Sequence, residues 1–551
     1  MASLVGVGWG LQKTACNGEA QIQHQNVLGF IKINYIIIFA KMLDTASIDD
    51  IHAPMQGGDI TYMDMVDERD SLGESNIQKF LGGSTIFLTG GTGFIGKLLI
   101  EKLLRLRKQQ PNFVEKIQGL EGDIGEPDLG LSEENRKLIS DEVDIILHGA
   151  ATVRFDEALR TAVAINVRGT KEMMLLAQTC KKLKAFVHTS TAYSYCPLKH
   201  IEEKFYNSPI PADNLIDLVE NVSEKTLNDI TKGLIGEHPN TYVYTKAVAE
   251  DAVLKYGKGL PVAMVRPSII IGTAKEPVSG WIDNIYGPTG IVVGATLGLL
   301  HTMQAKSSVT ADMVPGDMVV NTIIAAAWKV SRGCHGNDQQ VPALDADPKV
   351  YNYVSGRRNP ITWEKFMKYN ETYGLQTPPV KTIWYYLLML NESKLVHMFW
   401  SILLHWIPAY VVDGILIVIG KKPMLRKAYK KIHKFSFILS YFAMNEWKFE
   451  DENTQTLYDS LTKADKHLFG FDIPAIDWND YFSTYVKGVR IYLLQDPLDT
   501  IPEGKSRFRK LRIAHYCLVS LAVYLLAQIL RDVAVNTIDF THILQEISHY
   551  L

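Results

Sequence analysis

The chain has 551 residues, and 47% of them are hydrophobic, which is enough for two or more domains with sizeable cores. Its formal net charge is -3, and no basic stretch is interleaved with aromatic residues, so nucleic acid is not expected as a partner. The five cysteines are scattered without a CxxC spacing, which indicates a reducing compartment and argues against a disulfide framework or a zinc site.

The first 80 residues carry no clear signal for a folded unit. They contain neither a basic n-region nor a convincing cleavage site, so a secretory signal peptide is not expected. The stretch VLGFIKINYIIIFA, residues 27–40, is apolar but short, and Lys32 and Asn34 interrupt it. We therefore interpret residues 1–80 as a leader of uncertain structure.

Between residues 84 and 345, strand-like and helical patterns alternate. STIFLTG, VDIILHGAA, AFVHTST and PVAMVRPSIII are short apolar runs that end at small or polar residues, as buried strands do. GFIGKLLIEKLLRLRK, NVRGTKEMMLLAQTCKKLK and YTKAVAEDAVLKYGK have the pattern of intervening helices. The alternation predicts an α/β domain with a doubly wound parallel sheet, in which ligands bind at the carboxyl ends of the strands.

The stretch TGGTGFIG follows the first of these strands and opens a helix, which is the context of a dinucleotide-binding turn. Gly90 allows the tight turn, Gly93 lets the backbone approach a pyrophosphate, and Gly96 permits close packing of helix on strand. The N-terminus of the helix, with Phe94 and Ile95, then faces the negative charge. A plain glycine turn is the alternative, but the position between strand and helix favours cofactor binding.

The stretch YVYTK supplies a candidate acid and base. Tyr242 and Lys246 are four residues apart and share one face of a helix. A phenol with a pKa near 10 transfers protons poorly at neutral pH, and lowering that pKa by about 3 units takes about 4 kcal/mol of stabilisation from nearby positive charge. A solvated pair on a helix surface is the alternative, and the preceding nucleotide turn favours the catalytic interpretation.

A hydroxyl at the end of a preceding strand should complete this group. AFVHTSTAY offers Thr189, Ser190 and Thr191. We expect Thr191, directly before the alanine, to face the substrate carbonyl, with Ser190 as second choice. Either hydroxyl could instead cap the end of the strand.

From about residue 348 the strand alternation ends. NPITWEKFMKYNETYG and KKPMLRKAYKKIHKFSFILSYF are amphipathic and predict a helical domain over residues 348–500. Residues 393–420 are strongly hydrophobic, but Pro408 and Asp413 interrupt them. A clean membrane span is therefore less expected here than an interfacial pair of helices.

The C-terminal stretch IAHYCLVSLAVYLLAQIL, residues 513–530, predicts a transmembrane helix. Its length is close to the ~20 apolar residues that cross a hydrocarbon core of ~30 Å, although a buried core helix has a similar pattern. A basic cluster precedes it, and the positive-inside rule then places the rest of the chain in the cytosol. The cluster consists of Lys505, Arg507, Arg509, Lys510 and Arg512.

Together these motifs resemble the extended short-chain dehydrogenase/reductases and, within that class, the fatty acyl-CoA reductases, particularly the insect-type enzymes. The resemblance covers roughly residues 84–530. It rests on HGAATVRFDE, VHTSTAY, PNTYVYTKAVAE, VRPSIIIGTAKEPVSGWIDNIYGPTGIVVG and FEDENTQTLYDSL.

The resemblance implies a reductase domain over residues 84–345, a smaller helical domain and a membrane enzyme of the endoplasmic reticulum or peroxisome. Such an enzyme reduces a long-chain acyl-CoA to a primary alcohol through an aldehyde, with two NADPH and release of CoA. Tyr242 and Thr191 would stabilise and protonate the oxyanion. In this context residues 393–420 could also form a buried region that contacts the acyl chain.

The resemblance also assigns roles to residues around the cofactor. Lys246 would contact the nicotinamide ribose, and Asn166 would support a water or the lysine. Asp123 fits the adenine edge, although Asn166 could be a helix cap and Asp123 a turn residue. The small side chains of Ala150 and Ala151, at the end of one strand, would leave room for the cofactor. Another strand ends with Arg266 and Pro267, as the corresponding strand does in the family.

Other reactive residues are given no catalytic role. Cys196 has no general base beside it in the sequence, so an acyl-cysteine intermediate is not expected. His148 and His188 have no acidic or histidine partner at ligand spacing, so no metal is expected. Residues 280–294 are the expected substrate-side loop, although their glycines fit plain turns as well.

One part of the family pattern is missing. In the family, the glycine turn and helix lead to a second strand whose basic residues meet the 2′-phosphate of NADPH. Here only KQQPNF separates that helix from VEKIQGLEGD, which already matches the third strand. The loss is expected to expose the interior of the sheet and to remove the phosphate site, unless residues of the helix such as Arg105, Arg107 and Lys108 substitute.

Two alternatives to an active reductase therefore stay open. One is a non-catalytic paralogue or isoform that binds lipid or partners without turnover. The other is a membrane-bound dehydrogenase for steroid-like substrates, which the match of the C-terminal domain disfavours.

Overall fold

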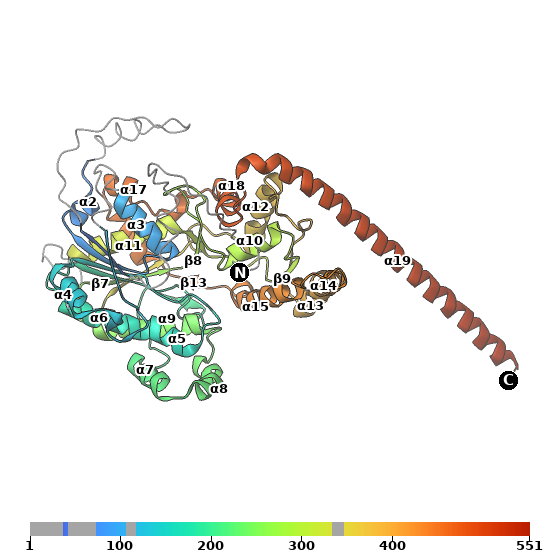
Figure 1. Ribbon diagram of the computed structural model, residues 1–551, viewed down its shortest axis with the longest axis horizontal. Coiled ribbons are helices and arrows are strands. Elements are labelled where there is room, and N and C mark those ends of the chain that lie inside the picture. Colours follow the sequence, from blue (N-terminus) through green and yellow to red (C-terminus); the bar gives the residue numbers. More distant parts are fainter. Residues whose placement is uncertain (1–36, 42–72, 106–116, 333–346, 551) are drawn as a thin grey trace.

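The computed structural model describes residues 37–41, 73–105, 117–332 and 347–550, and a seven-stranded sheet forms its centre (Figure 1). Across the sheet the strands are β11 (Lys349–Tyr353), β7 (Val262–Pro267), β5 (Ala185–Thr189), β4 (Ile145–His148), β2 (Thr85–Thr89), β1 (Ile37–Lys41) and β3 (Ile117–Leu120). All pairs from β11 to β2 are parallel. The predicted doubly wound parallel sheet is therefore confirmed over these five strands.

Strand β1 comes from the leader and occupies the place between β2 and β3. It runs antiparallel to both neighbours, with Ile37 opposite Thr89 and Leu120, and Lys41 opposite Thr85. The expectation of an open sheet interior is wrong, because this strand fills the gap. The facing edges of β2 and β3 would otherwise present unpaired backbone groups, and any extended segment of suitable sequence can pair with them.

Two layers of helices cover the sheet because successive strand residues point to opposite faces. Ile86 and Leu88 pack on one side, with α2 (Asn76–Leu81), α3 (Phe94–Arg105) and α11 (Gly316–Ser331). Phe87 packs on the other side, with α4 (Glu133–Glu142), α6 (Gly169–Thr179) and α9 (Thr241–Tyr256). Figure 1 shows both layers, and α5 (Leu159–Val163), α7 (Ala212–Asn221) and α8 (Glu224–Ile235) extend the second one.

A second apolar core lies beyond the sheet and combines segments from both halves of the chain. Its centre is aromatic, with Phe366, Phe482 and Tyr485 fully buried. The helices here are α10 (Pro288–Thr296), α12 (Trp363–Gln376) and α18 (Trp478–Gly488), followed by a π-turn at Val489–Leu493. Two two-stranded pairs tie residues 84–345 to residues 348–500: β9 (Thr302–Gln304) with β12 (Met389–Asn391), and β6 (His200–Ile201) with β13 (Lys448–Phe449). A third pair, β8 (Ile269–Ile271) with β10 (Met313–Pro315), lies within the first of these regions.

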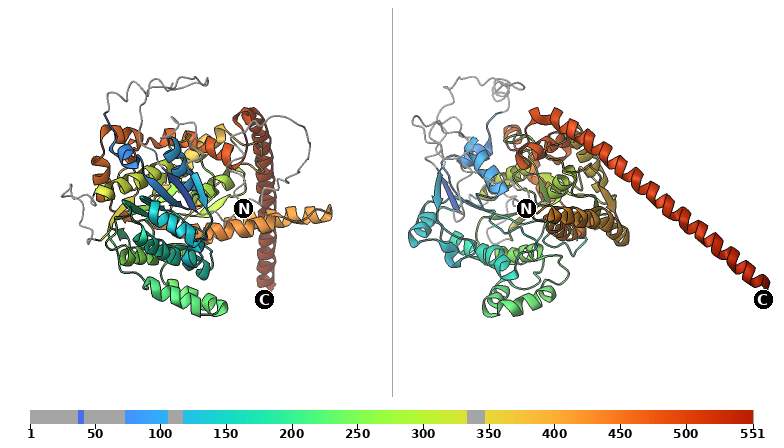
Figure 2. Two further views of the ribbon diagram at one scale, coloured as in Figure 1. Left: turned by 60° about the vertical axis from the view of Figure 1, so that its left-hand side comes forward. Right: turned by 45° about the vertical axis from the view of Figure 1, so that its right-hand side comes forward.

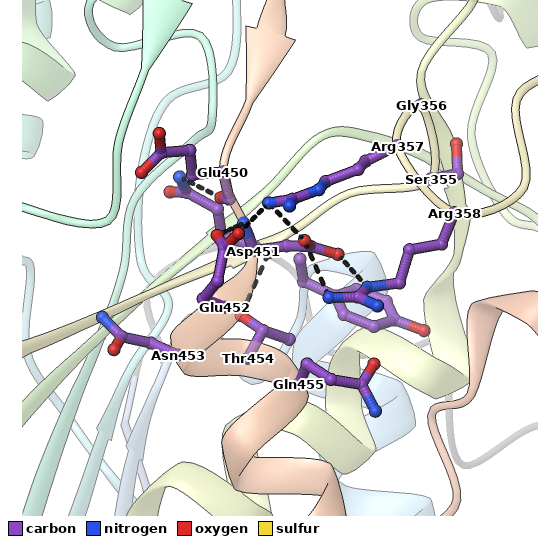
Figure 3. A network of polar contacts seen from close by, with 12 residues as sticks. Ser355, Gly356, Arg357, Arg358, Glu450, Asp451, Glu452, Asn453, Thr454 and Gln455 are labelled. Carbon is purple, nitrogen blue, oxygen red and sulfur yellow. Dashed lines mark hydrogen bonds and ion pairs between the residues drawn. The ribbon is translucent and has the colours of Figure 1, made fainter.

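The segment FEDENTQTLYDSL joins the C-terminal half to the edge of the sheet. Arg358 pairs with Asp451, and Arg357 reaches both Asp451 and Glu452 at the start of α16 (Glu452–Asp459), as Figure 3 shows. Helix α16 packs on β11, and α17 (Lys463–Leu468) follows it. Thr454 also donates to a backbone carbonyl of β11, that of Asn352, at 3.0 Å. These contacts fix the helical region against the parallel sheet.

Two helices are long and apolar enough to cross a membrane, by length and composition. The first runs through α13 (Lys394–Ser401), a π-turn (Ile402–Trp406) and α14 (Ile407–Val418), and α15 (Leu425–Met444) returns beside it. The second lies in α19 (Ile501–Tyr550), which projects from the body in Figure 2. Only 22% of the apolar window of the first and none of the second is buried, so neither is a core helix.

Candidate active site

The glycine turn between β2 and α3 is shaped for close approach of a ligand. Gly90 has φ +75°, and a Cβ there would lie 2.8 Å from the backbone nitrogen of Ala150. A Cβ on Gly96 would lie 2.1 Å from the carbonyl oxygen of Gly90. The Gly93 N–H donates to that same carbonyl at 2.9 Å, which closes the turn directly before the N-terminus of α3. This turn fits the pyrophosphate of a dinucleotide.

The neighbours of the turn divide between the cavity and the core. Ile95, Ala151 and Pro267 line a cavity of about 250 Å³. Ala150 is buried and donates its N–H to Thr89 Oγ1 at 3.3 Å. Phe94 stacks on Trp281 with ring centroids 5.3 Å apart, so its side chain packs in the protein.

Tyr242, Lys246 and Thr191 converge on one cavity. The side chain of Asn240 caps α9 by accepting from the N–H of Val243, which starts the helix directly before Tyr242. The phenol of Tyr242 forms a hydrogen bond with the Thr191 hydroxyl. Lys246 donates from Nζ to the carbonyl oxygen of Thr189 at 2.8 Å. The strand end and the helix thus bring together the three groups that their motifs predict.

Burial shifts the pKa of Tyr242 and the pKa of Lys246 in opposite directions. It raises the pKa of Tyr242 to about 12, against the effect of the hydrogen bond with Thr191. It lowers the pKa of Lys246 to about 8, against the attraction of Glu250. The phenol is therefore protonated at neutral pH and can donate a hydrogen bond, while Lys246 still carries most of its charge.

Ser190 and Arg266 belong to a buried ion-pair network. Ser190 Oγ donates to Glu250 at 2.6 Å, Ser194 Oγ donates to the same oxygen at 2.9 Å, and Arg266 Nε donates to it at 2.9 Å. Neither Arg266 nor Glu250 has any exposed side-chain surface. Arg266 also donates to the carbonyl oxygens of Glu202 and Lys204, so its guanidinium is directed into the protein.

The network gives the two candidate hydroxyls at the end of β5, those of Ser190 and Thr191, different hydrogen-bond partners. The Ser190 proton is held by a carboxylate, whereas Thr191 faces Tyr242. Sequence reasoning missed Glu250. The available signal was its spacing, four residues after Lys246 on a helix that the alternation places against the sheet, where a carboxylate requires a partner.

Asn166 lies in a π-turn (Ala164–Arg168) between α5 and α6 and fixes the loop after β4. Its Oδ1 accepts from the N–H of Thr152 at 3.0 Å, and its Nδ2 donates to Thr152 O and to Thr245 Oγ1 at 3.2 and 3.0 Å. It therefore contacts the residue next to Lys246 rather than Lys246 itself. Asp123 is exposed after β3 and accepts from the N–H of Gly125 at 2.8 Å, as a turn residue does.

The cavity that joins these groups has a volume of about 250 Å³ and two chemically different ends. One end holds Thr191, Tyr242 and Lys246. The other is apolar and comes from the second core and from α15, with Ile291, Met303, Trp363, Leu439 and Phe442 among its walls. Residues of the predicted substrate-side loop, from Tyr286 to Pro288, also line it. The arrangement can place an apolar chain beside a hydrogen-bond donor pair.

The remaining reactive groups near the site are occupied or inert. His148 bonds Thr89 through Nδ1 at 2.7 Å, and burial lowers its pKa to about 3. His188 is buried against it, with ring centroids 5.3 Å apart. Burial raises the pKa of the Cys196 thiol to about 12, which disfavours the reactive thiolate. Among the described residues, no three acidic, histidine or cysteine side chains are arranged to hold a metal ion.

Two family models match the chain, and both are described as male sterility protein. The first, an NAD-binding model, covers residues 88–114 and 106–323, and the second covers residues 404–496. The first therefore identifies a nicotinamide cofactor for the sheet domain. Its two pieces meet at residues 106–114, where the sequence passes from the glycine-turn helix almost directly to the third strand.

Curated relatives match over most of their own length. Fatty acyl-CoA reductase wat of Drosophila melanogaster is 39% identical over 485 residues, which cover 82% of this chain and 92% of the relative. Fatty acyl-CoA reductase 1 of Homo sapiens is 36% identical over 490 residues, which cover 82% and 93%. A solved structure, the terminal R domain from the myxalamid PKS-NRPS biosynthetic pathway, is similar with 19% identity and TM-score 0.45, covering 75% of this chain and 92% of that one. By its curated relatives, the chain belongs to the fatty acyl-CoA reductase family.

Proposed function

We propose that this protein is an oxidoreductase that reduces long-chain acyl-CoA to a primary fatty alcohol and free CoA with NADPH, through an aldehyde. The observation that carries the proposal is the cavity in which the Tyr242, Thr191 and Lys246 side chains meet an apolar wall. Membership of the family supplies the substrate class. In this assignment residues 84–345 perform the reduction, residues 348–500 cover the acyl chain, and residues 513–530 anchor the protein.

The chain's residues would bind and orient the cofactor and manage charge on the substrate oxygen. The turn of Gly90, Gly93 and Gly96 would hold the pyrophosphate, and Lys246 the nicotinamide ribose. When bound, the nicotinamide supplies one hydride at each of the two reductions. Hydrogen bonds from Tyr242 and Thr191 stabilise the negative charge that develops on the thioester oxygen, since both donors are positioned before the reaction begins.

Collapse of the resulting oxyanion breaks the carbon–sulfur bond and expels the CoA thiolate. The aldehyde remains in the site. At the second reduction the aldehyde oxygen becomes an alkoxide, which takes the proton of Tyr242. The Lys246 ammonium stabilises the phenolate that remains, and solvent restores the proton. No acyl-enzyme is needed, which agrees with the suppressed acidity of Cys196.

The preference for NADPH over NADH rests on the resemblance to the family alone. The carboxyl end of β1 lies at the opposite edge of the sheet from that of β2, because the strands are antiparallel. In a parallel sheet, the last residue of the strand at the position of β1 contacts the ribose of the cofactor. The last residue of β1 therefore cannot make this contact. The side chains of Arg105, Arg107 and Lys108, the suggested substitutes, lie outside the described residues.

The test is turnover by the full-length protein in phospholipid vesicles, supplied with labelled hexadecanoyl-CoA and either NADPH or NADH. Labelled hexadecanol with NADPH is the expected product, and hexadecanal trapped by a carbonyl reagent should appear on the way. Tight nucleotide binding without product would instead support the non-catalytic alternative. Failure to bind either nucleotide would overturn the enzyme assignment altogether.

We also propose that α19 anchors the protein in the endoplasmic reticulum or peroxisome with the catalytic domain in the cytosol. The basic residues Lys505, Arg507, Arg509, Lys510 and Arg512 precede the apolar part of α19 and support this orientation. Protease added to intact organelles should then remove the catalytic domain. Protection of that domain until the membrane is dissolved would contradict the orientation.

The two hydroxyls at the end of β5 should respond differently to truncation. Thr191→Val removes a donor to the substrate oxygen and should lower kcat by about 10²–10³-fold. Ser190→Ala removes a hydrogen bond to Glu250 and should mainly reduce stability, by about 1 kcal/mol, with kcat close to that of the unmodified protein. Steady-state kinetics and thermal unfolding of both variants measure this contrast. The reverse pattern would reassign the substrate contact to Ser190.

The rate should depend on pH through Lys246. Because its pKa in the folded protein is about 8, kcat/KM for the acyl-CoA is expected to fall as the pH rises through about 8. Stability should change in the opposite direction, because between about 8 and 10.5 the unfolded chain binds more protons at this site than the folded one does. A pH profile of kcat/KM measured beside a pH profile of unfolding checks both signs. A decline in rate that follows loss of folding would contradict this origin.

A further inference from the structure

The segment of residues 394–434, here called the apolar hairpin, exposes an unusual amount of apolar surface. Its first helix, from α13 through α14, carries large apolar side chains that are at least two-fifths exposed along most of its length, with Leu395 at 72% and Val418 at 87%. Soluble monomers rarely present contiguous apolar surface of this extent. The surface therefore requires an apolar partner.

Buried hydrogen bonds hold the turn of the hairpin in a defined conformation. Asp413 is buried at 1% exposure and accepts from the N–H groups of Met424, Leu425 and Arg426 at 2.9, 2.9 and 3.0 Å. The same carboxylate accepts from Arg426 Nε at 3.1 Å. An aspartate in the middle of an apolar helix thus caps the next helix and locks the turn at Gly420, which has φ +72°.

Positive charge is concentrated beside the apolar surface. The hairpin contains eight lysine and arginine residues and one aspartate, although the whole chain has a net charge of -3. Five lysines of the turn and of α15 are exposed and have no acidic partner among the described residues: Lys421, Lys422, Lys427, Lys430 and Lys431. An apolar stripe bordered by unpaired lysines is complementary to a lipid surface with anionic headgroups.

The hairpin is continuous with the anchor helix. Residues 382–385 contact the N-terminal turns of α19, where Arg507 Nε donates to Thr382 O at 2.7 Å and Trp384 Nε1 donates to His515 Nδ1 at 3.3 Å. The chain then continues through β12 into α13. Figures 1 and 2 show the hairpin and α19 leaving the same side of the body.

We propose that the apolar hairpin lies in the interface of an anionic phospholipid bilayer, the bilayer that α19 crosses. Its apolar face enters the acyl region, and its lysines contact the headgroup phosphates. A transmembrane path is disfavoured because α15 would then have to return through the hydrocarbon with Lys427, Lys430 and Lys431 exposed. In an interfacial position the apolar face contacts acyl chains while the lysines stay among the headgroups and water.

The interfacial position has a consequence for the cavity, which rests on the proposed function. The far end of α15 supplies Leu439, Phe442 and Ala443 to the cavity wall. Docking of the hairpin would therefore hold the apolar end of the cavity close to the bilayer, where long acyl chains are concentrated.

The test is photocrosslinking of the full-length protein in vesicles of phosphatidylcholine and phosphatidylserine. The photoreactive residue p-benzoylphenylalanine replaces Val418 in one variant and, as a matched control, Ile230 of α8, which is 37% exposed on a different part of the body. Phospholipid adducts are expected at position 418 and not at position 230. Absence of lipid adducts at 418, or adducts to protein in their place, would overturn the proposal.

A charge variant tests the headgroup contact separately. Replacing Lys421, Lys422, Lys427, Lys430 and Lys431 with glutamine should reduce the adduct yield at 418 by about fivefold in the mixed vesicles, to the level in phosphatidylcholine alone. Equal yields in both lipids and both variants would overturn the anionic part of the proposal. Crosslinking needs neither acyl-CoA nor cofactor, so its failure is distinguishable from failure of the proposed reduction.

Discussion

Tyr242→Phe is expected to lower kcat by about 10³–10⁴-fold and to leave the KM for acyl-CoA nearly unchanged. The substitution removes one oxygen, which in our proposal donates to the thioester oxygen and later protonates the alkoxide. Both interactions strengthen as charge develops, so their loss raises the barrier more than it weakens substrate binding. The measurement is single-turnover and steady-state formation of labelled alcohol by the full-length protein in vesicles.

The same helix provides a matched control. Tyr244 is two residues away, is 1% exposed, and packs among Leu159, Val163 and Ala252 in a separate apolar cluster. Tyr244→Phe removes the same atom from a position with no access to the cavity and should keep kcat within about twofold. If both variants lose activity equally, the effect of Tyr242 is structural. If neither loses activity, Tyr242 is not the proton donor.

Local patterns were sufficient for the parallel sheet and for the grouping of Tyr242, Lys246 and Thr191. The glycine turn depends on steric limits at Gly90 and Gly96 that few sequences satisfy, and the alternating apolar runs indicate the strands of a parallel sheet. The long apolar helix at the C-terminus also follows from composition alone. These features are readable because the residues that cause them are close together in the chain.

The origin of β1 could not be predicted in this way. Its sequence, IIFAK, is rich in residues that favour strands, but it lies among residues we interpreted as a leader, well before the two strands with which it pairs. Strands adjacent in a doubly wound sheet are expected in chain order with parallel direction, and β1 violates both expectations. Only the pairing of Ile37 with Thr89 and with Leu120 shows which segment takes the place of the missing strand.

The roles of polar residues were harder to predict than their positions. Asp413 looked like an interruption of an apolar run, whereas three backbone N–H groups eleven to thirteen residues later make it a cap. Ser190 was the second choice after Thr191 for the substrate contact, but a carboxylate sixty residues away holds its proton. Satisfaction of buried polar groups depends on contacts that are distant in sequence, which periodicity cannot show.

Substitution of that carboxylate, Glu250, is expected to cause a large loss of folding stability. Glu250→Leu should destabilise the fold by about 3–5 kcal/mol, because it leaves the charge of Arg266 buried without a counter-ion. For a domain of this size the melting temperature should fall by about 6–9 °C. Thermal unfolding of the full-length protein in detergent micelles, read by tryptophan fluorescence, measures the shift. A surface ion cluster gives the control: Asp141→Asn, which breaks the contacts with Lys137 and Lys181, should produce no measurable shift.

The double variant Glu250→Leu/Arg266→Met decides whether the cost comes from the unpaired charge. If it does, removing Arg266 as well should recover part of the stability, because the pair's mutual attraction and its desolvation both disappear. The double variant should then melt above the Glu250→Leu variant, even though it has lost one more buried polar group. If the losses are instead additive, Glu250 stabilises the fold through Ser190 and Ser194, and the ion pair with Arg266 is secondary. In either case the end of β5 loses its anchor, so Thr191 should be less well positioned and kcat should fall in parallel with stability at temperatures below unfolding.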